Sequence, residues 1–260
     1  MEKIINADDF GMSDDINRAI ERAFERGCVT SASLATNGAR AGDALKFARD
    51  NPSLRIGVHL TLTEGPPLSD PASLPLLVGA DGRLAHGFAR LLWLSFTRES
   101  DLLEQAELEW RKQIDAALEY GIVISHLDSH RHVHMIPALF RLAVRLRREY
   151  GVPRLRIVNE DFLNSLFTAR SPAPFFDGAL VKYAVLKTFY HWNRTGSDTY
   201  FYGISYTGKI WGSRARVSVP RRYDAVEVAL HPRAVTDGAA SDFATAADAD
   251  FPGRISRKSH

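Results

Sequence analysis

Short apolar runs alternate with amphipathic segments along the first 160 residues. The apolar runs have the length and the β-branched, hydrophobic composition of buried strands. Four of them predict strands at Lys3–Ala7, Val29–Thr36, Arg55–Leu62 and Ile122–Leu127. Later runs at Leu155–Val158 and Ala225–Leu230 predict two more strands of the same kind.

Between these runs, apolar residues recur at every third or fourth position, which predicts helices with one buried face. The first helix should begin after Ser13, a residue type that caps helix N-termini, and end at Gly27. Further helices are expected over Ala41–Arg49, Leu103–Leu118 and Ile136–Val144. Strands that alternate with helices of this length indicate an α/β fold with a mainly parallel sheet.

Two segments do not follow this alternation. The stretch Thr63–Arg83 is rich in proline and glycine, and it is long enough to be a functional loop rather than a simple connector. Residues 159–219 hold many aromatic side chains and form a variable region of unclear role. Because no linker, repeat or low-complexity tract divides the chain before its Ala/Asp-rich tail, we expect one domain over residues 1–260.

Composition narrows the function classes. Of the 260 residues 45% are hydrophobic and 25% are charged, which is typical of a globular protein. A net charge of +2 does not favour a nucleic-acid partner, and no apolar run reaches the 18 residues that a membrane span needs. The single cysteine, Cys28, excludes an intramolecular disulfide and fits a reducing compartment. We therefore expect a cytoplasmic protein.

Polar side chains stand at the ends of four predicted strands. Asp8 and Asp9 follow the first strand, His59 lies in the third, and His231 ends the last. The strand that ends near residue 127 carries the densest group: His126, Asp128, His130, His132 and His134. Ligands of α/β folds bind at the carboxyl ends of parallel strands, so these residues point to one shared pocket.

Each of these residues also has a purely structural interpretation. His59 alone could be a packed core residue, the Asp8–Asp9 pair could stabilise a helix N-terminus, and His231 could simply end a strand. The group from His126 to His134 is harder to explain in this way, because five such polar side chains are costly to bury unless they bind something.

Imidazole and carboxylate groups together suit a divalent ion such as zinc, and carboxylate-rich sites also take magnesium. A hydrolytic metal needs an open position that holds water, whose pKa the ion lowers. A second carboxylate can then act as general base and a separate histidine as general acid. The adjacent Asp8 and Asp9 could divide these tasks.

The motifs resemble those of the YdjC-like carbohydrate deacetylases, a family that includes chitooligosaccharide and hopanoid-associated deacetylases. The resemblance rests on Asn6–Gly11 (NADDFG), Gly57–Leu62 (GVHLTL) and His126–His134 (HLDSHRHVH), and it returns at Glu227–Pro232 (EVALHP). The three N-terminal motifs together are highly specific, whereas each alone would be weak.

This resemblance implies a deformed (β/α) barrel related to the polysaccharide deacetylases. It also implies hydrolysis of an N-acetyl group from an amino sugar, with one divalent ion, Mg²⁺ or Zn²⁺, as cofactor. By motif position, Asp9, His59 and His130 would bind the metal, Asp8 would be the base and His231 the acid. His134 would support the site without binding the ion.

The residues alone are also compatible with two other functions. The chain could be a metal-dependent esterase or phosphate hydrolase, although Arg131 is the one basic residue near the predicted site that could clamp a phosphate. It could also be a metal- or sugar-binding protein without turnover, but that role leaves Asp8 unexplained. The sequence does not determine which sugar is the substrate, how long it is or whether it is attached to a lipid. It also does not determine whether the protein forms a homodimer.

Overall fold

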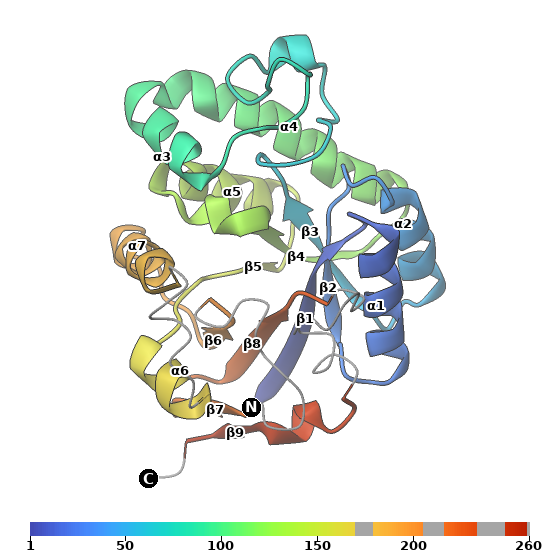
Figure 1. The fold of residues 1–260 in the computed structure, drawn as a ribbon, viewed down its shortest axis with the longest axis vertical. Coiled ribbons are helices and arrows are strands. Elements are labelled where there is room, and N and C mark those ends of the chain that lie inside the picture. Colours follow the sequence, from blue (N-terminus) through green and yellow to red (C-terminus); the bar gives the residue numbers. More distant parts are fainter. Residues whose placement is uncertain (170–178, 205–215, 233–247, 259–260) are drawn as a thin grey trace. The chain divides into compact units, whose positions relative to one another are not determined.

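Parallel strands form the main sheet of the computed structural model, which describes residues 1–169, 179–204, 216–232 and 248–258 (Figure 1). Their order is β5-β4-β3-β2-β1-β8-β6. The strands are β1 (Glu2–Phe10), β2 (Ser31–Leu34), β3 (Arg55–Leu60), β4 (Ile124–Ser129), β5 (Arg154–Leu155), β6 (Thr199–Tyr202) and β8 (Ala225–Leu230). In the described part of the chain this is a curled half-barrel sheet, which confirms the predicted α/β class and deformed barrel.

Helices connect most of these strands. The α-helices are α1 (Asp14–Glu25), α2 (Ala41–Asp50), α3 (Phe88–Thr97), α4 (Glu99–Glu119), α5 (Pro137–Glu149), α6 (Phe162–Ala169) and α7 (Ala179–Trp192). Short 3-10 helices lie at η1 (Pro71–Ser73), η2 (His130–Met135) and η5 (Phe251–Arg254). A second, two-stranded parallel sheet pairs β7 (Val217–Val219) with β9 (Ile255–Arg257).

The chain forms two compact units, each built from separate stretches of sequence. One consists of Met1–Asp8, Arg18–Ala32 and Ile157–His260, and the other of Asp9–Asn17 and Ser33–Arg156. In the first unit β8 pairs in parallel with β1 and β6, and in the second β4 pairs with β3 and β5. The single domain predicted over residues 1–260 stays a prediction.

The ends of α1 follow the predicted signals. The Ser13 hydroxyl oxygen accepts a hydrogen bond from the Ile16 backbone N–H at 3.3 Å, as an N-cap does. Gly27 has φ 73°, a left-handed conformation that favours glycine and stops the helix. Both termini of this helix are therefore encoded locally.

Other predicted boundaries were wrong. The strand expected over Leu155–Val158 is reduced to the two residues of β5, and the next residue in the chain is the buried Arg156. Helices α3 and α7 were not predicted from the sequence. None of the helices in the described ranges has both the length and the apolar character needed to cross a membrane.

Helix α4 fixes the proline-rich loop that follows β3. Its buried residues Gln105, Glu109 and Gln113 are spaced four apart and share one face. The Glu109 carboxylate accepts hydrogen bonds from the backbone N–H groups of Leu68 and Ser69 at 2.9–3.1 Å. Gln105 accepts from Leu76 N–H, Gln113 accepts from Thr61 N–H, and Gln113 also donates to Glu109. The loop is thus held along its backbone by one row of side chains.

We expect Glu109→Ala to destabilise the protein, because Ser69 N–H would lose its buried acceptor. An orphaned buried donor costs about 1–3 kcal/mol, and this loss can be measured as the change in free energy of unfolding in urea. Glu104→Ala, an exposed position on the same helix, is the control and should change stability by less than about 0.5 kcal/mol. Equal effects of the two substitutions would contradict the role assigned to Glu109.

Candidate metal centre

Strand register brings the predicted residues to the strand ends. In the β3–β4 pair, His59 lies opposite Asp128 and Leu60 opposite Ser129. In the β1–β8 pair, Ala7 lies opposite Leu230. Asp8 is the next residue of β1, and His231 is the residue that follows β8. Parallel pairing therefore aligns polar residues that are far apart in the sequence.

Asp9 turns the chain at the end of β1. Its φ is 70°, in the left-handed region, which aspartate tolerates better than most other residues. The turn is secured two residues later, where the Gly11 backbone N–H donates to the Asn17 side-chain oxygen at 2.7 Å. A constrained backbone at a residue of this kind is typical of functional sites.

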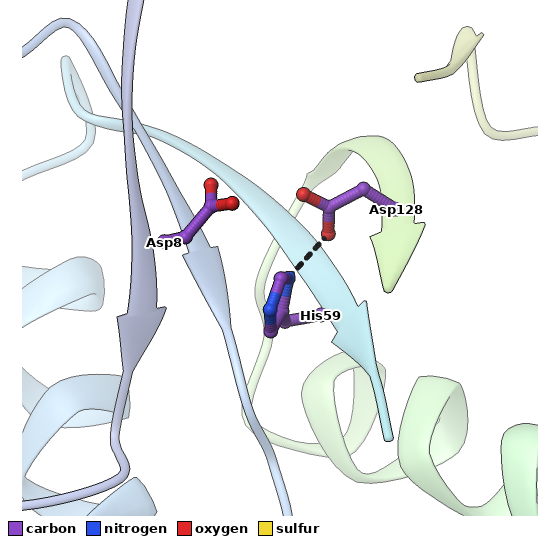
Figure 2. Close-up of side chains that lie close together, drawn as sticks. All are labelled: Asp8, His59 and Asp128. Carbon is purple, nitrogen blue, oxygen red and sulfur yellow. Dashed lines mark hydrogen bonds and ion pairs between the residues drawn. The ribbon is translucent and has the colours of Figure 1, made fainter. Parts of the chain in front are cut away.

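His59 lies between two carboxylates. Its Nδ1 is 2.8 Å from Asp128 Oδ1, a hydrogen-bonding distance, and Figure 2 shows this contact. Its Nε2 is 3.4 Å from Asp9 Oδ1, which is longer than a charge-assisted hydrogen bond. The side chains of all three residues are buried. The ring is therefore fixed through Nδ1, and its Nε2 faces Asp9.

Asp128 is fully buried and makes three contacts with donors. Besides His59, Arg156 approaches Oδ2 at 2.6 Å and the Ser33 hydroxyl donates to the same oxygen at 2.8 Å. Burial alone would raise the pKa of Asp128, but the charge of Arg156 and the neighbouring His59 hold that pKa well below its usual range. The residue is therefore a carboxylate at neutral pH.

His126 fills the space above a glycine of the neighbouring strand. Its Nε2 lies 3.1 Å from the Ser33 hydroxyl and its Nδ1 lies 2.9 Å from the Ser125 hydroxyl. Gly57 leaves room for the ring, because a Cβ at that position would lie 2.3 Å from a His126 ring carbon. The packing of the His126 ring therefore explains why glycine occupies position 57, within the motif Gly57–Leu62.

His130 stands beside His59 at the start of η2. The two ring centroids are 5.9 Å apart. Nδ1 of His130 is 2.7 Å from the Thr63 hydroxyl, and Nε2 is 3.9 Å from a carboxylate oxygen of the exposed Glu64. The first residues of the loop that begins at Thr63 therefore reach the predicted ligand.

His134 is engaged by the protein at both ring nitrogens. Nδ1 lies 2.6 Å from the Ser129 hydroxyl, and Nε2 lies 3.0 Å from the Arg156 carbonyl oxygen. Burial lowers its pKa to about 4, so the ring is neutral at pH 7. A neutral ring that bonds a carbonyl must donate from Nε2 and accept at Nδ1. This geometry fits a supporting residue rather than a metal ligand.

Asp8 and His231 lie together in the other unit. The Asn6 side-chain amide donates to Asp8 Oδ1 at 2.7 Å. His231 Nε2 is 3.7 Å from Asp8 Oδ2, and the Asp8 side chain is 1% exposed against 20% for His231. A buried carboxylate thus stands next to a partly accessible imidazole.

His59 and Asp128 form a pair of ligand-type side chains within one compact unit, with His59 Nδ1 2.8 Å from Asp128 Oδ1 (Figure 2). This pair shares His59 with the set expected from the motifs (Asp9, His59 and His130) but contains Asp128 in place of the other two residues. Carboxylate and imidazole donors of either set suit a divalent cation.

Two residues of the Asp128 network were missed in the sequence. Ser33 lies in a short, wholly buried strand and Arg156 lies in a predicted apolar run. An arginine within such a run was a signal, because a buried guanidinium needs an anionic partner. The sequence pattern places its partner, Asp128, within the histidine-rich cluster but does not pair the two residues.

A family model described as YdjC-like protein matches residues 3–257. Curated relatives named carbohydrate deacetylase are similar to part of this chain. The protein of Brevibacillus brevis is 38% identical over 59% of this chain and 58% of the relative. The protein of Oceanobacillus iheyensis is 38% identical over 57% of this chain and 62% of the relative. A carbohydrate deacetylase of Clostridium beijerinckii is 34% identical over 65% of this chain and 66% of the relative. The matched part of this chain thus spans between 58% and 66% of these relatives.

A solved structure from Enterococcus faecalis, described as that of a candidate cellobiose-phosphate cleavage protein, is similar in fold. It superposes with a TM-score of 0.61 over 96% of this chain and 89% of that one, at 23% sequence identity. At this identity the similarity establishes the fold alone.

We expect Gly57→Ala to displace the His126 ring, because the added Cβ would overlap it. Overpacking of this kind costs about 1–3 kcal/mol, measurable by urea unfolding. The matched control is Gly42→Ala in α2, where nothing lies within 4 Å of the added Cβ, so that stability should stay the same or rise slightly. An unchanged stability for Gly57→Ala would mean that His126 moves at no cost.

Proposed function

Because this chain belongs to the YdjC-like protein family, we propose that it is a metal-dependent hydrolase that removes an N-acetyl group from an amino sugar or short oligosaccharide. The observation that carries the proposal is His59, held through Nδ1 by Asp128 with its Nε2 3.4 Å from Asp9. The relatives named carbohydrate deacetylase support the reaction and the substrate class.

The donor set fits a divalent ion. Two ligands of one zinc or magnesium ion each lie about 2.0–2.2 Å from it, which places them about 2.8–3.6 Å apart. The 3.4 Å between His59 Nε2 and Asp9 Oδ1 falls within this interval, and His130 lies next to His59. We therefore assign Asp9, His59 and His130 as the ligands of one Zn²⁺ or Mg²⁺. When bound, the ion would polarise the acetyl carbonyl and acidify a water molecule.

Asp8 and His231 supply the proton transfers in this proposal. Asp8, oriented by Asn6, takes a proton from the water that attacks the acetyl carbon. The C–N bond then breaks, and protonated His231 gives its proton to the leaving nitrogen, so that acetate and an amine are released. The two groups lie close together, with Asp8 Oδ2 3.7 Å from His231 Nε2.

Two segments of the chain are candidates for recognising the substrate. Thr63 and Glu64 touch or face His130, so the loop from Thr63 to Arg83 is the first candidate. Residues 159–219 are the second, although 170–178 and 205–215 lie outside the described residues. A glycolipid such as a hopanoid derivative belongs in any substrate screen, next to soluble N-acetylated sugars.

Two other functions are distinguished by experiment. An esterase or phosphate hydrolase would release product from acyl esters or phosphate esters but not acetate from N-acetylated sugars. A binding protein would bind metal or sugar without forming any product.

Three further properties remain proposals: a cytoplasmic location, a single domain over residues 1–260 and a homodimer. Size-exclusion chromatography with light scattering tests whether the protein is a homodimer.

We expect one divalent ion per chain and full loss of acetate release after treatment with a chelator. His130→Ala should lose the metal, because its imidazole is one of three protein ligands. Metal content measured by plasma mass spectrometry after dialysis tests this, with His191→Ala at the exposed end of α7 as control. A His130→Ala protein that keeps its full metal content would remove His130 from the ligand set.

We expect Asp8→Asn and His231→Ala each to lower kcat on the order of 10²–10⁴-fold, the usual contribution of a general base or acid. Metal content should stay near one ion per chain in both variants, because neither residue is assigned as a ligand. The exposed Asp15→Asn in α1 is the matched control. Full activity of either variant would show that another residue carries that proton.

A further inference from the structure

We infer that Asp128 is a positioning residue that fixes the tautomer of His59, rather than a ligand of the metal. The inference rests on the proposed function only in taking Nε2 of His59 as the metal-binding atom. It starts from the contacts of the Asp128 carboxylate, which is fully buried between three elements of one compact unit.

Both oxygens of Asp128 already have donors. Oδ1 receives the His59 ring at 2.8 Å, and Oδ2 receives Arg156 at 2.6 Å and the Ser33 hydroxyl at 2.8 Å. Binding an ion through either oxygen would weaken one of these contacts inside the protein, where a lost partner is costly. The short distance between Asp128 Oδ1 and His59 Nδ1 is therefore explained as a hydrogen bond between them.

The donors around Asp128 also decide which nitrogen of His59 carries the proton. The guanidinium of Arg156 can only donate hydrogen bonds, and the carboxylate of Asp128 can only accept them. Nδ1 of His59 must therefore be the N–H in this contact. When the ring is neutral, its lone pair is then on Nε2, the atom that faces Asp9. Only a nitrogen with a lone pair can bind a cation, so the contact prepares His59 for a metal.

An asparagine at position 128 would reverse this arrangement. Its oxygen would turn toward Arg156, because a guanidinium cannot accept a hydrogen bond, and its NH₂ group would face His59. Nδ1 would then have to accept, the ring proton would move to Nε2, and metal binding there would be weakened.

The test is ¹⁵N NMR of histidine-labelled, metal-free protein at pH 8.5, with His59 assigned from the signal that His59→Gln lacks. In the wild type we expect a protonated Nδ1, and in Asp128→Asn we expect Nδ1 to shift to the unprotonated range. The affinity for Zn²⁺ should fall about 10–100-fold in the variant, the usual effect of a supporting partner. Asp101→Asn at the exposed start of α4 is the matched control and should change neither quantity.

An unprotonated Nδ1 in the wild type would overturn the inference, and this holds even if Asp128→Asn does not fold. An unchanged His59 signal in a folded Asp128→Asn would overturn it as well. The spectrum is recorded without metal or substrate, so it is independent of the proposed reaction. A protein that releases no acetate but shows protonated Nδ1 would disprove the function and leave the tautomer assignment standing.

Discussion

The ion pair between Asp128 and Arg156 is buried at both ends, and the arrangement of the second unit's strand ends depends on it. Removing one partner of such a pair leaves an uncompensated charge in the interior, at a cost of about 3–5 kcal/mol. The pair also ties β4 to the residue that follows β5, where the Arg156 carbonyl receives His134. One ion pair therefore positions two histidines: Asp128 contacts His59, and the Arg156 carbonyl oxygen contacts His134.

Parallel pairing explains how the polar residues come together. Register aligns His59 with Asp128 in one unit and the residues after Ala7 and Leu230 in the other. Side chains at strand ends can be polar because the sheet interior behind them is apolar and carries the stability. In η2, two left-handed residues, Arg131 and His132, separate His130 from His134, so the two rings meet different partners.

The loop after β3 is held differently from a mobile lid. Buried acceptors on α4 bind its backbone N–H groups at several points, and Asn37 donates to two of its carbonyl oxygens. A backbone fixed in this way presents Thr63 and Glu64 to His130 at constant geometry. If the proposed function holds, such a loop favours selection of the substrate by shape, with little rearrangement.

The sequence by itself determined the α/β class, the ends of α1 and the residue types at the strand ends, because periodicity, caps and composition are local properties. Asp9, His59 and His130 could be named from their motifs, but the ligand set is still a prediction. Only the tertiary structure decided that Asp128 meets Arg156, and that the run expected as a strand stops before that arginine. The reason is physical: an ion pair is a long-range contact, and no local pattern specifies which buried charge will find which partner.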